Sequence, residues 1–175
     1  SLDLFWVLDD EWQELLFRLG PEWFGGDDDA RNLTFVYTHH LRGDRDKMLA
    51  NAEMTRSRLA QHLEVLPDDP GLHVYLGSAL AYLGRGEEAV PHGRRGLGLT
   101  RGYRTGRPAA YFQLQLVRSH IILGELEPAL DMLEPLLEVP FYLSPGWLSI
   151  DPLFDPLRDH PRFQALLEEY FSEQR

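Results

Sequence analysis

The chain has 175 residues, of which 43% are apolar, so it is long enough and apolar enough to fold as one domain around a core. Its formal charge of −11 argues against a general affinity for nucleic acid or for an anionic membrane surface. The absence of cysteine excludes disulfides and thiolate metal sites, and no apolar run reaches the roughly 18 residues that indicate a membrane-spanning helix. We therefore expect a cytoplasmic segment without direct membrane contact, although a longer parent protein could still be anchored in a membrane.

Residues 1–29 are predicted to form a helix and a loop that pack on the remainder of the chain. Apolar residues over positions 3–19 recur at helical spacing and share one stripe: Leu4, Phe5, Leu8, Trp12, Leu15, Leu16 and Leu19. Gly20-Pro21 ends that helix. The acidic run 27–29 lacks the spaced oxygen ligands of a calcium loop, so we interpret it as a solvated turn or a helix cap.

Three short glycine-containing phrases follow at almost constant spacing, and each marks a turn between two helices. Gly43, Gly84 and Gly124 are 41 and 40 residues apart (84 − 43 and 124 − 84), and each ends one apolar-periodic segment and precedes another. Glycine suits such a turn because it adopts the left-handed conformation without steric cost. Repetition at this period is typical of a stacked array of helical hairpins. The sequence therefore predicts an array over residues 30–140, with three hairpins at about 30–66, 70–100 and 108–139.

Residues 141–175 are predicted to form a C-terminal capping segment. Asp155-Pro156 and His160-Pro161 are expected to begin short helices, because proline is well tolerated in a first helical turn. The last of these helices would cover the final hairpin, as the end of a repeat array requires, through an apolar face: Phe163, Leu166, Leu167, Tyr170 and Phe171. No segment shows the alternating β-branched pattern of strands, so the predicted fold is all-α.

The second hairpin resembles the tetratricopeptide repeat (TPR), whose paired helices use a Leu-Gly step, a turn glycine and a small alanine after the turn. The residues that carry the resemblance are Leu76-Gly77, Leu80, Leu83-Gly84 and Ala89. The third hairpin departs from the pattern with Val117 at the step glycine, and the first has Met48 in place of the alanine. The resemblance implies a right-handed superhelix of antiparallel hairpins with a C-terminal capping helix.

The C-terminal tail over residues 141–171 adds to this resemblance. Its Asp-Pro-Leu-Phe-Asp-Pro-Leu-Arg phrase at 151–158 is similar to an ending of TPR-type regions in bacterial multidomain signalling proteins. In those proteins the region follows a protein kinase, a nucleotide cyclase or a winged-helix regulator. The resemblance implies that this chain is the C-terminal interaction domain of a larger bacterial regulatory protein.

Stacked hairpins present their first helices on a concave surface, and aligning the turn glycines predicts which side chains face it. The predicted groove residues are Tyr37, His40, Ser78, Tyr82, Tyr111, Leu114, Arg118 and Ile122, with Leu41 and Val74 beside them. They form an apolar, aromatic surface with one cation, which suits a peptide that carries a carboxylate. Equally, a terminal segment could fill the groove and turn these residues into core. The lysine- and asparagine-rich clamp that some members of the family use for acidic tails is missing.

An arginine-rich stretch is a second candidate site, for an anion or an acidic partner. It comprises Arg94, Arg95, Arg101, Arg104 and Arg107. The interpretation that we favour is simpler: arginines near the end of a helix are stabilised by its dipole, and the loop that follows is solvated.

Metal binding and catalysis find little support in the sequence. Adjacent His39 and His40 would point about 100° apart on a helix and could not share one ion. Glu88 and His92 have a suitable i, i+4 spacing but lack the second histidine of a zinc motif. We therefore expect no metal, no cofactor and no catalytic residues.

Two functions remain open at this point. The first is a non-enzymatic scaffold that binds a protein or peptide in its groove, or that self-associates into a homo-oligomer. The alternative is a sensor domain that binds a small apolar or anionic molecule there and regulates an attached output domain. An enclosed pocket would favour sensing, whereas an open trough or a symmetric contact between copies would favour protein binding.

Overall fold

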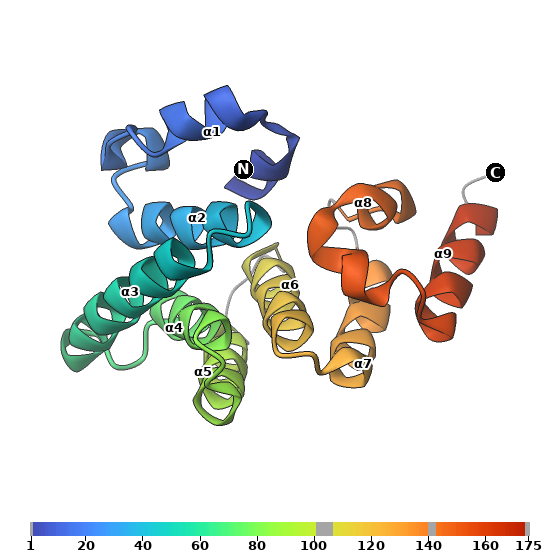
Figure 1. Cartoon of the computed structure of the whole chain (residues 1–175). Coiled ribbons are helices and arrows are strands. Elements are labelled where there is room, and N and C mark those ends of the chain that lie inside the picture. Colours follow the sequence, from blue (N-terminus) through green and yellow to red (C-terminus); the bar gives the residue numbers. More distant parts are fainter. Residues whose placement is uncertain (1, 101–106, 140–142, 174–175) are drawn as a thin grey trace.

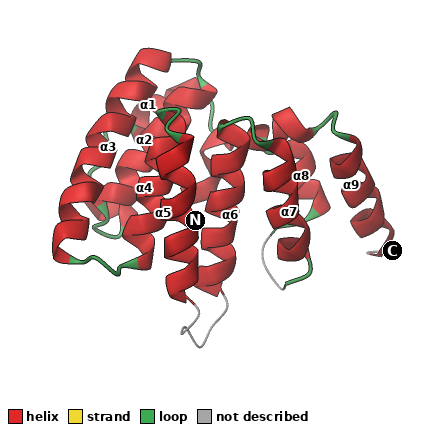
Figure 2. Cartoon of the chain, turned by 90° about the horizontal axis from the view of Figure 1, so that it is seen from below, coloured by secondary structure: helices red, strands yellow, loops and turns green. Residues whose placement is uncertain are grey.

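The computed structural model describes residues 2–100, 107–139 and 143–173, and every regular element in these ranges is helical. Figures 1 and 2 show the helices lying side by side, with α1 to α3 at one end of the molecule and α9 at the other. The elements in chain order are η1 (Leu2–Val7), α1 (Asp10–Leu16), η2 (Pro21–Phe24), α2 (Asp28–Leu41), α3 (Arg45–Val65), α4 (Pro70–Tyr82), α5 (Gly86–Leu99), α6 (Arg107–Ile122), α7 (Leu126–Leu137), α8 (Pro145–Ile150), η4 (Pro152–Leu157) and α9 (Pro161–Glu173). The all-α prediction is confirmed for the described part of the chain.

Three helical hairpins, α2–α3, α4–α5 and α6–α7, form the body of the molecule, and each helix packs against its neighbours in chain order. Their turns are equivalent, because Gly43, Gly84 and Gly124 all have positive φ, at 71°, 73° and 77°. In each turn the residue after the glycine donates its backbone N–H to a carbonyl five residues earlier, at 2.9 Å. These bonds satisfy carbonyls that the helix end would otherwise leave unpaired. The helices begin and end within two residues of the predicted ranges.

Glycines bring α4 and α5 into close contact. A Cβ atom on Gly77 would lie 2.8 Å from the carbonyl oxygen of Ala89, and one on Gly96 would lie 2.6 Å from the carbonyl oxygen of Pro70. On the other side of α5, a Cβ on Gly93 would lie 2.6 Å from Cδ1 of Leu116 in α6. The glycines of α5 therefore allow close packing on both sides, which offsets their low helix propensity.

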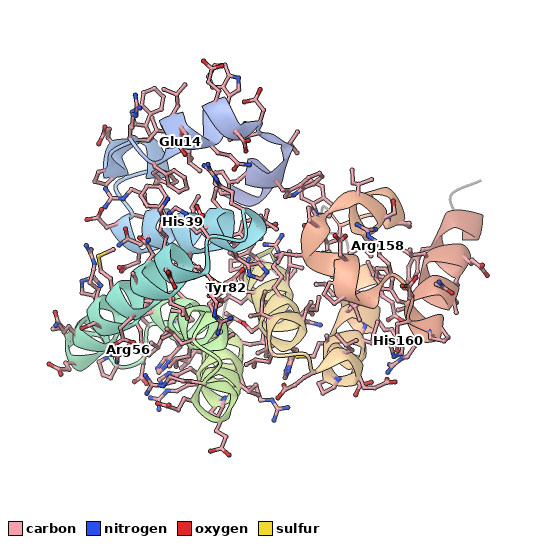
Figure 3. The ribbon with its side chains drawn as sticks, in the orientation of Figure 1. Glu14, His39, Arg56, Tyr82, Arg158 and His160 are labelled. Atoms are coloured by element: carbon pink, nitrogen blue, oxygen red, sulfur yellow. The ribbon has the colours of Figure 1, made fainter. Side chains whose placement is uncertain are left out.

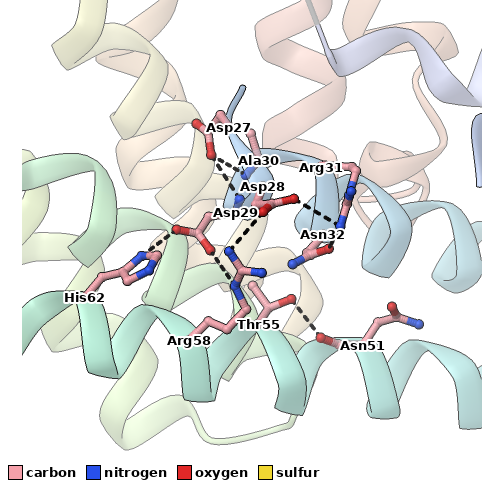
Figure 4. Close-up of polar contacts among 10 residues, drawn as sticks. All are labelled: Asp27, Asp28, Asp29, Ala30, Arg31, Asn32, Asn51, Thr55, Arg58 and His62. Atoms are coloured by element: carbon pink, nitrogen blue, oxygen red, sulfur yellow. Dashed lines mark hydrogen bonds and ion pairs between the residues drawn. The ribbon is translucent and has the colours of Figure 1, made fainter. Parts of the chain in front are cut away.

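A polar cluster joins the start of α2 to the C-terminal half of α3 (Figure 4). Asp27 caps α2 by accepting from the backbone N–H groups of Asp29 and Ala30, at 3.0 and 2.9 Å. The Asp29 side chain is buried, and its carboxylate lies 2.9 Å from Nδ1 of His62 and 3.4 Å from Nε of Arg58. The predicted helix cap is present, and Asp29 within the acidic run is buried, because α3 packs over it.

The N-terminal segment differs from its prediction. A single helix over residues 3–19 was expected, but the 3₁₀ helix η1 ends at Val7 and α1 starts afresh, because Asp9 caps it by accepting from the N–H of Trp12 at 3.0 Å. The predicted apolar stripe is therefore divided, and Trp12 is 59% exposed. The segment packs on α2 through buried or half-buried residues such as Phe17, whose ring stacks on His39 at 4.4 Å.

The C-terminal segment closes the opposite end of the molecule. α9 begins at Pro161 as predicted, and its Phe163 and Leu166 are buried in the same core cluster as residues of α6 and α7. The side chain of Phe171, also predicted for this face, lies outside the described residues. Asp155-Pro156 does not begin a helix: η4 starts three residues earlier at Pro152, because Asp151 caps it by accepting from the N–H of Leu153 at 3.0 Å.

Candidate functional site

Two adjoining hollows lie along the side chains of α2, α4 and α6. The first has a volume of about 70 Å³, and six of the eight predicted groove residues line it: Tyr37, Ser78, Tyr82, Tyr111, Arg118 and Ile122. The second has a volume of about 300 Å³ and lies beside the turns at Gly43 and Gly84. Tyr82 and Ile122 line both hollows, so the two adjoin, and we refer to them together as the trough. Figure 3 shows Tyr82 near the place where α3, α4 and α6 meet.

The other two predicted groove residues occupy different positions. His40 is exposed and lines the second hollow, where its ring contacts Tyr82 edge to face at 5.3 Å. Leu114 is fully buried in the main core cluster and lines neither hollow. Val74, at 2% exposure, is also core. The turn-glycine alignment thus selected seven residues that line one or both hollows, together with Leu114 and Val74, which are packed in the interior.

The cation of the first hollow is already paired within the chain. Arg118 is 7% exposed, and its Nη2 atom lies 3.4 Å from Oδ2 of Asp151, which is completely buried. The same carboxylate accepts from the Tyr37 hydroxyl at 3.2 Å and from the Trp147 indole N–H at 3.1 Å. The position where a ligand carboxylate was expected is therefore next to a carboxylate of the C-terminal segment.

Two tyrosines of the trough remain neutral donors. Burial is the main cause that raises the pKa of Tyr37, and the Asp151 carboxylate raises it further. Burial likewise raises the pKa of Tyr82 above the ordinary value. Both phenols therefore keep their protons throughout the physiological range; the Tyr37 hydroxyl donates its proton to Asp151, and the trough presents mainly aromatic rings to an occupant.

Both terminal segments border the trough. Phe5 of η1 and Leu153 of η4 line the first hollow, and Trp6 contacts Trp147 edge to face at 6.0 Å. The hollow nevertheless remains in their presence. The terminal segments narrow the groove without filling it.

Several trough residues were absent from the sequence prediction. Tyr75, Gln115 and Ser119 line the first hollow. Tyr75 could have been found, because it lies on the same helical stripe as Ser78 and Tyr82, three and seven residues away. Asp151 had no comparable signal, since its place depends on how the C-terminal segment folds back.

The arginine-rich stretch is only partly described. Arg94 and Arg95 are exposed on α5, and Arg95 pairs with Asp68 at 2.9 Å. Arg101 and Arg104 lie outside the described residues, as does the side chain of Arg107, the first residue of α6. The part that can be placed is a helix face with one cation already paired, which leaves the proposed anion patch untested.

Within the described ranges, no three histidine, aspartate or glutamate side chains lie close enough to hold a metal ion. Among the helices placed by the structure, none combines the length and apolarity that crossing a membrane requires. Comparisons of the chain with protein-family models, with curated proteins and with solved structures find no significant match. The trough is therefore the feature from which a function has to be inferred.

Proposed function

We propose that the chain is a non-catalytic interaction module, a TPR-like scaffold that binds a protein or peptide segment along α2, α4 and α6. The observation that carries the proposal is the tyrosine-lined trough to which three successive hairpins contribute their first helices. Apolar and aromatic faces of this kind bind extended or helical segments in many proteins. In this proposal the hairpins belong to a right-handed superhelix, and the repeat phrases and the C-terminal ending support a place within a larger bacterial regulatory protein.

The trough gives less support to a sensor of small molecules. The first hollow measures about 70 Å³, whereas sites for drug-sized ligands span roughly 300–1,000 Å³. The second hollow, at about 300 Å³, reaches only the lower limit of that range. An anionic ligand would also have to compete with Asp151 for Arg118, at 3.4 Å. These observations favour a side chain or short segment of a protein as the occupant.

A selection of random peptides displayed on phage, with the purified chain as bait, tests the proposal. We expect the enriched peptides to share a pattern of apolar residues and to bind in the trough. Tyr82→Ala and Tyr111→Ala should each weaken the affinity roughly tenfold, because buried aromatic side chains dominate interface energies. Isothermal titration calorimetry gives the dissociation constants, and circular dichroism checks that each variant remains folded.

The matched control is Trp23→Ala, which removes an aromatic side chain that is 70% exposed and lies outside the trough. It should leave peptide affinity unchanged. The proposal fails if no peptide is enriched, or if binding survives both tyrosine changes. Light scattering over a concentration range then tests whether a second copy of the chain is the occupant. In that case the wild type has the molecular mass of a dimer and the tyrosine variants have that of a monomer.

A further inference from the structure

Two histidines on neighbouring helices of the second hairpin contact each other through the same kind of ring nitrogen. His73 of α4 and His92 of α5 place their Nδ1 atoms 2.9 Å apart, and their ring centroids are separated by 5.1 Å. His73 is 5% exposed, and its Nε2 atom lies 3.0 Å from the carbonyl oxygen of Pro67. The pair therefore joins three segments: α4, α5 and the loop between α3 and α4.

These contacts assign the tautomer of each ring. A carbonyl oxygen can only accept, so Nε2 of His73 carries a proton and donates it to Pro67. Nδ1 of neutral His73 is then an acceptor, and Nδ1 of His92 must be the donor between the rings. The neutral pair thus has one arrangement of protons that satisfies both contacts.

The same geometry limits how many further protons the pair can hold. One extra proton fits on Nε2 of His92, because the charged ring still donates its Nδ1–H to His73. A second would have to occupy Nδ1 of His73, where two N–H groups would face each other across 2.9 Å. The folded pair accepts at most one extra proton, whereas two separate imidazoles in an unfolded chain accept two.

We propose that the His73–His92 pair makes the packing of α4 against α5 sensitive to pH. The neutral pair stabilises the contact between the two helices, and protonation in mild acid weakens it. The backbones of α4 and α5 have little freedom to shift against each other, because the helices touch close to the pair. A Cβ atom on Gly96 would lie 2.6 Å from the carbonyl oxygen of Pro70 and 2.6 Å from Val74. Relief of the conflict therefore requires movement of the loop or of α5, or rotation of the half-buried His92 ring away from His73.

The charged groups around the pair shift the pKa of His92 in opposite directions. Arg95 and Glu88 lie on α5, about one turn to either side of His92, and Asp68 of the α3–α4 loop pairs with Arg95 at 2.9 Å. Burial in the first place, followed by His73 and Arg95, holds the pKa of His92 below its ordinary value, while Glu88 opposes the shift. The environment thus favours the neutral pair that the ring geometry requires.

The sign of the pH effect follows from the proton count. Below about pH 6.5 the unfolded chain binds more protons than the folded pair, and the difference approaches one proton well below that pH, so acid favours unfolding. One excluded proton lowers the folding constant about tenfold for each pH unit. Well above that range both rings are neutral in both states, and this contribution does not change with pH.

Chemical unfolding of the wild type and of His92→Gln between about pH 7 and pH 5 tests the proposal. A glutamine amide can donate to neutral His73 or, turned over, accept from its protonated form, so the variant removes the limit on protons. We expect the wild-type folding constant to fall more steeply than that of the variant, with the difference in slope approaching about tenfold per pH unit toward pH 5. Arg94→Gln, exposed on the same helix, leaves both rings in place and should keep the wild-type slope.

Long-range proton–nitrogen NMR spectra of the folded wild type provide a second test that does not depend on any variant. At neutral pH they should show a proton on Nε2 of His73 and on Nδ1 of His92. During acidification only one of the two rings should become doubly protonated before the protein unfolds. Equal pH slopes for the wild type and His92→Gln, or two imidazolium rings in the folded protein, would overturn the proposal.

Discussion

The first two hairpins share the same turn but are joined by different chemistry. In α4–α5 the helices touch through glycine, and a Cβ on Gly77 would lie 2.8 Å from a backbone carbonyl and 2.9 Å from a backbone nitrogen. In α2–α3 a buried carboxylate, Asp29, binds Arg58 and His62, whose side chains are 36% and 47% exposed. Backbone atoms cannot turn aside, whereas exposed cations can return to water. We therefore infer that the glycine contact tolerates less change.

The C-terminal segment supplies a third kind of contact, polar like that of Asp29 but completely buried. Asp151 has no exposed surface, and the arginine that faces it, Arg118, is 7% exposed. The three contacts differ in burial and in polarity, so comparing them shows how much each property contributes to stability. Substitutions at each of them give a series in which the expected loss of stability decreases from the buried charge to the surface.

The largest loss is expected for Asp151→Ala. The substitution leaves the buried Arg118 without its carboxylate, and Tyr37 and Trp147 lose an acceptor. Removal of one partner from a buried ion pair costs about 3–5 kcal/mol. Urea unfolding measures the change, with Asp155→Ala as the control, because that side chain is 59% exposed and pairs with Arg158 on the surface. Similar losses for the two variants would show that burial does not set the cost.

The glycine contact should give the next largest effect. Gly77→Ala gains helix propensity but places a methyl group against the backbone of α5, so we expect a net loss of about 2 kcal/mol. Gly98 is the matched control, because a Cβ there meets nothing within 4 Å. Gly98→Ala should therefore stabilise α5 by about 0.5–1 kcal/mol. If both variants are stabilised, the close contact at Gly77 is not a constraint.

This contrast also explains what the sequence could predict. A glycine in a turn acts through the conformation of its own backbone, so Gly43, Gly84 and Gly124 marked the turns of the three hairpins correctly. The alignment of these turns also placed Tyr37, Tyr82 and most other predicted side chains on the trough, although their role in binding stays a prediction.

Contacts between segments that are distant in the sequence could not be predicted in the same way. Asp29 meets His62 across 33 residues, and Tyr37 meets Asp151 across 114. No local pattern distinguishes these aspartates from solvated ones. The single N-terminal helix was predicted wrongly because the apolar spacing continues across Asp9, where a cap starts a new helix.

For Asp29→Asn we expect a loss of about 1 kcal/mol, less than at the glycine contact. The amide keeps one acceptor oxygen, and Arg58 and His62 can be hydrated after the charge is removed. Asp46→Asn serves as the control, since Asp46 is exposed in the first turn of the same hairpin's second helix, and should change stability by less than about 0.5 kcal/mol. A loss at Asp29 as large as that at Asp151 would mean that the exposed cations are not free to reorient.

The smallest effect, and the one most sensitive to salt, is expected at the surface contact between α7 and α9. Arg162 bonds with Glu134, Asp131 and Glu127 at 2.6 to 2.9 Å, and its hydrogen bonds hold the pKa of Glu134 below the ordinary value. A carboxyl group whose pKa is lowered on folding stabilises the fold at pH values above 4.5, the ordinary pKa of the group. This stabilisation is lost as the pH falls through the pKa of the folded state. The Arg162→Gln variant should therefore be slightly less stable than the wild type at neutral pH. The difference between their free energies of unfolding should shrink in about 1 M NaCl and in acid. A difference that neither salt nor acid reduces would mean that the arginine stem, rather than its charge, holds α9 against α7.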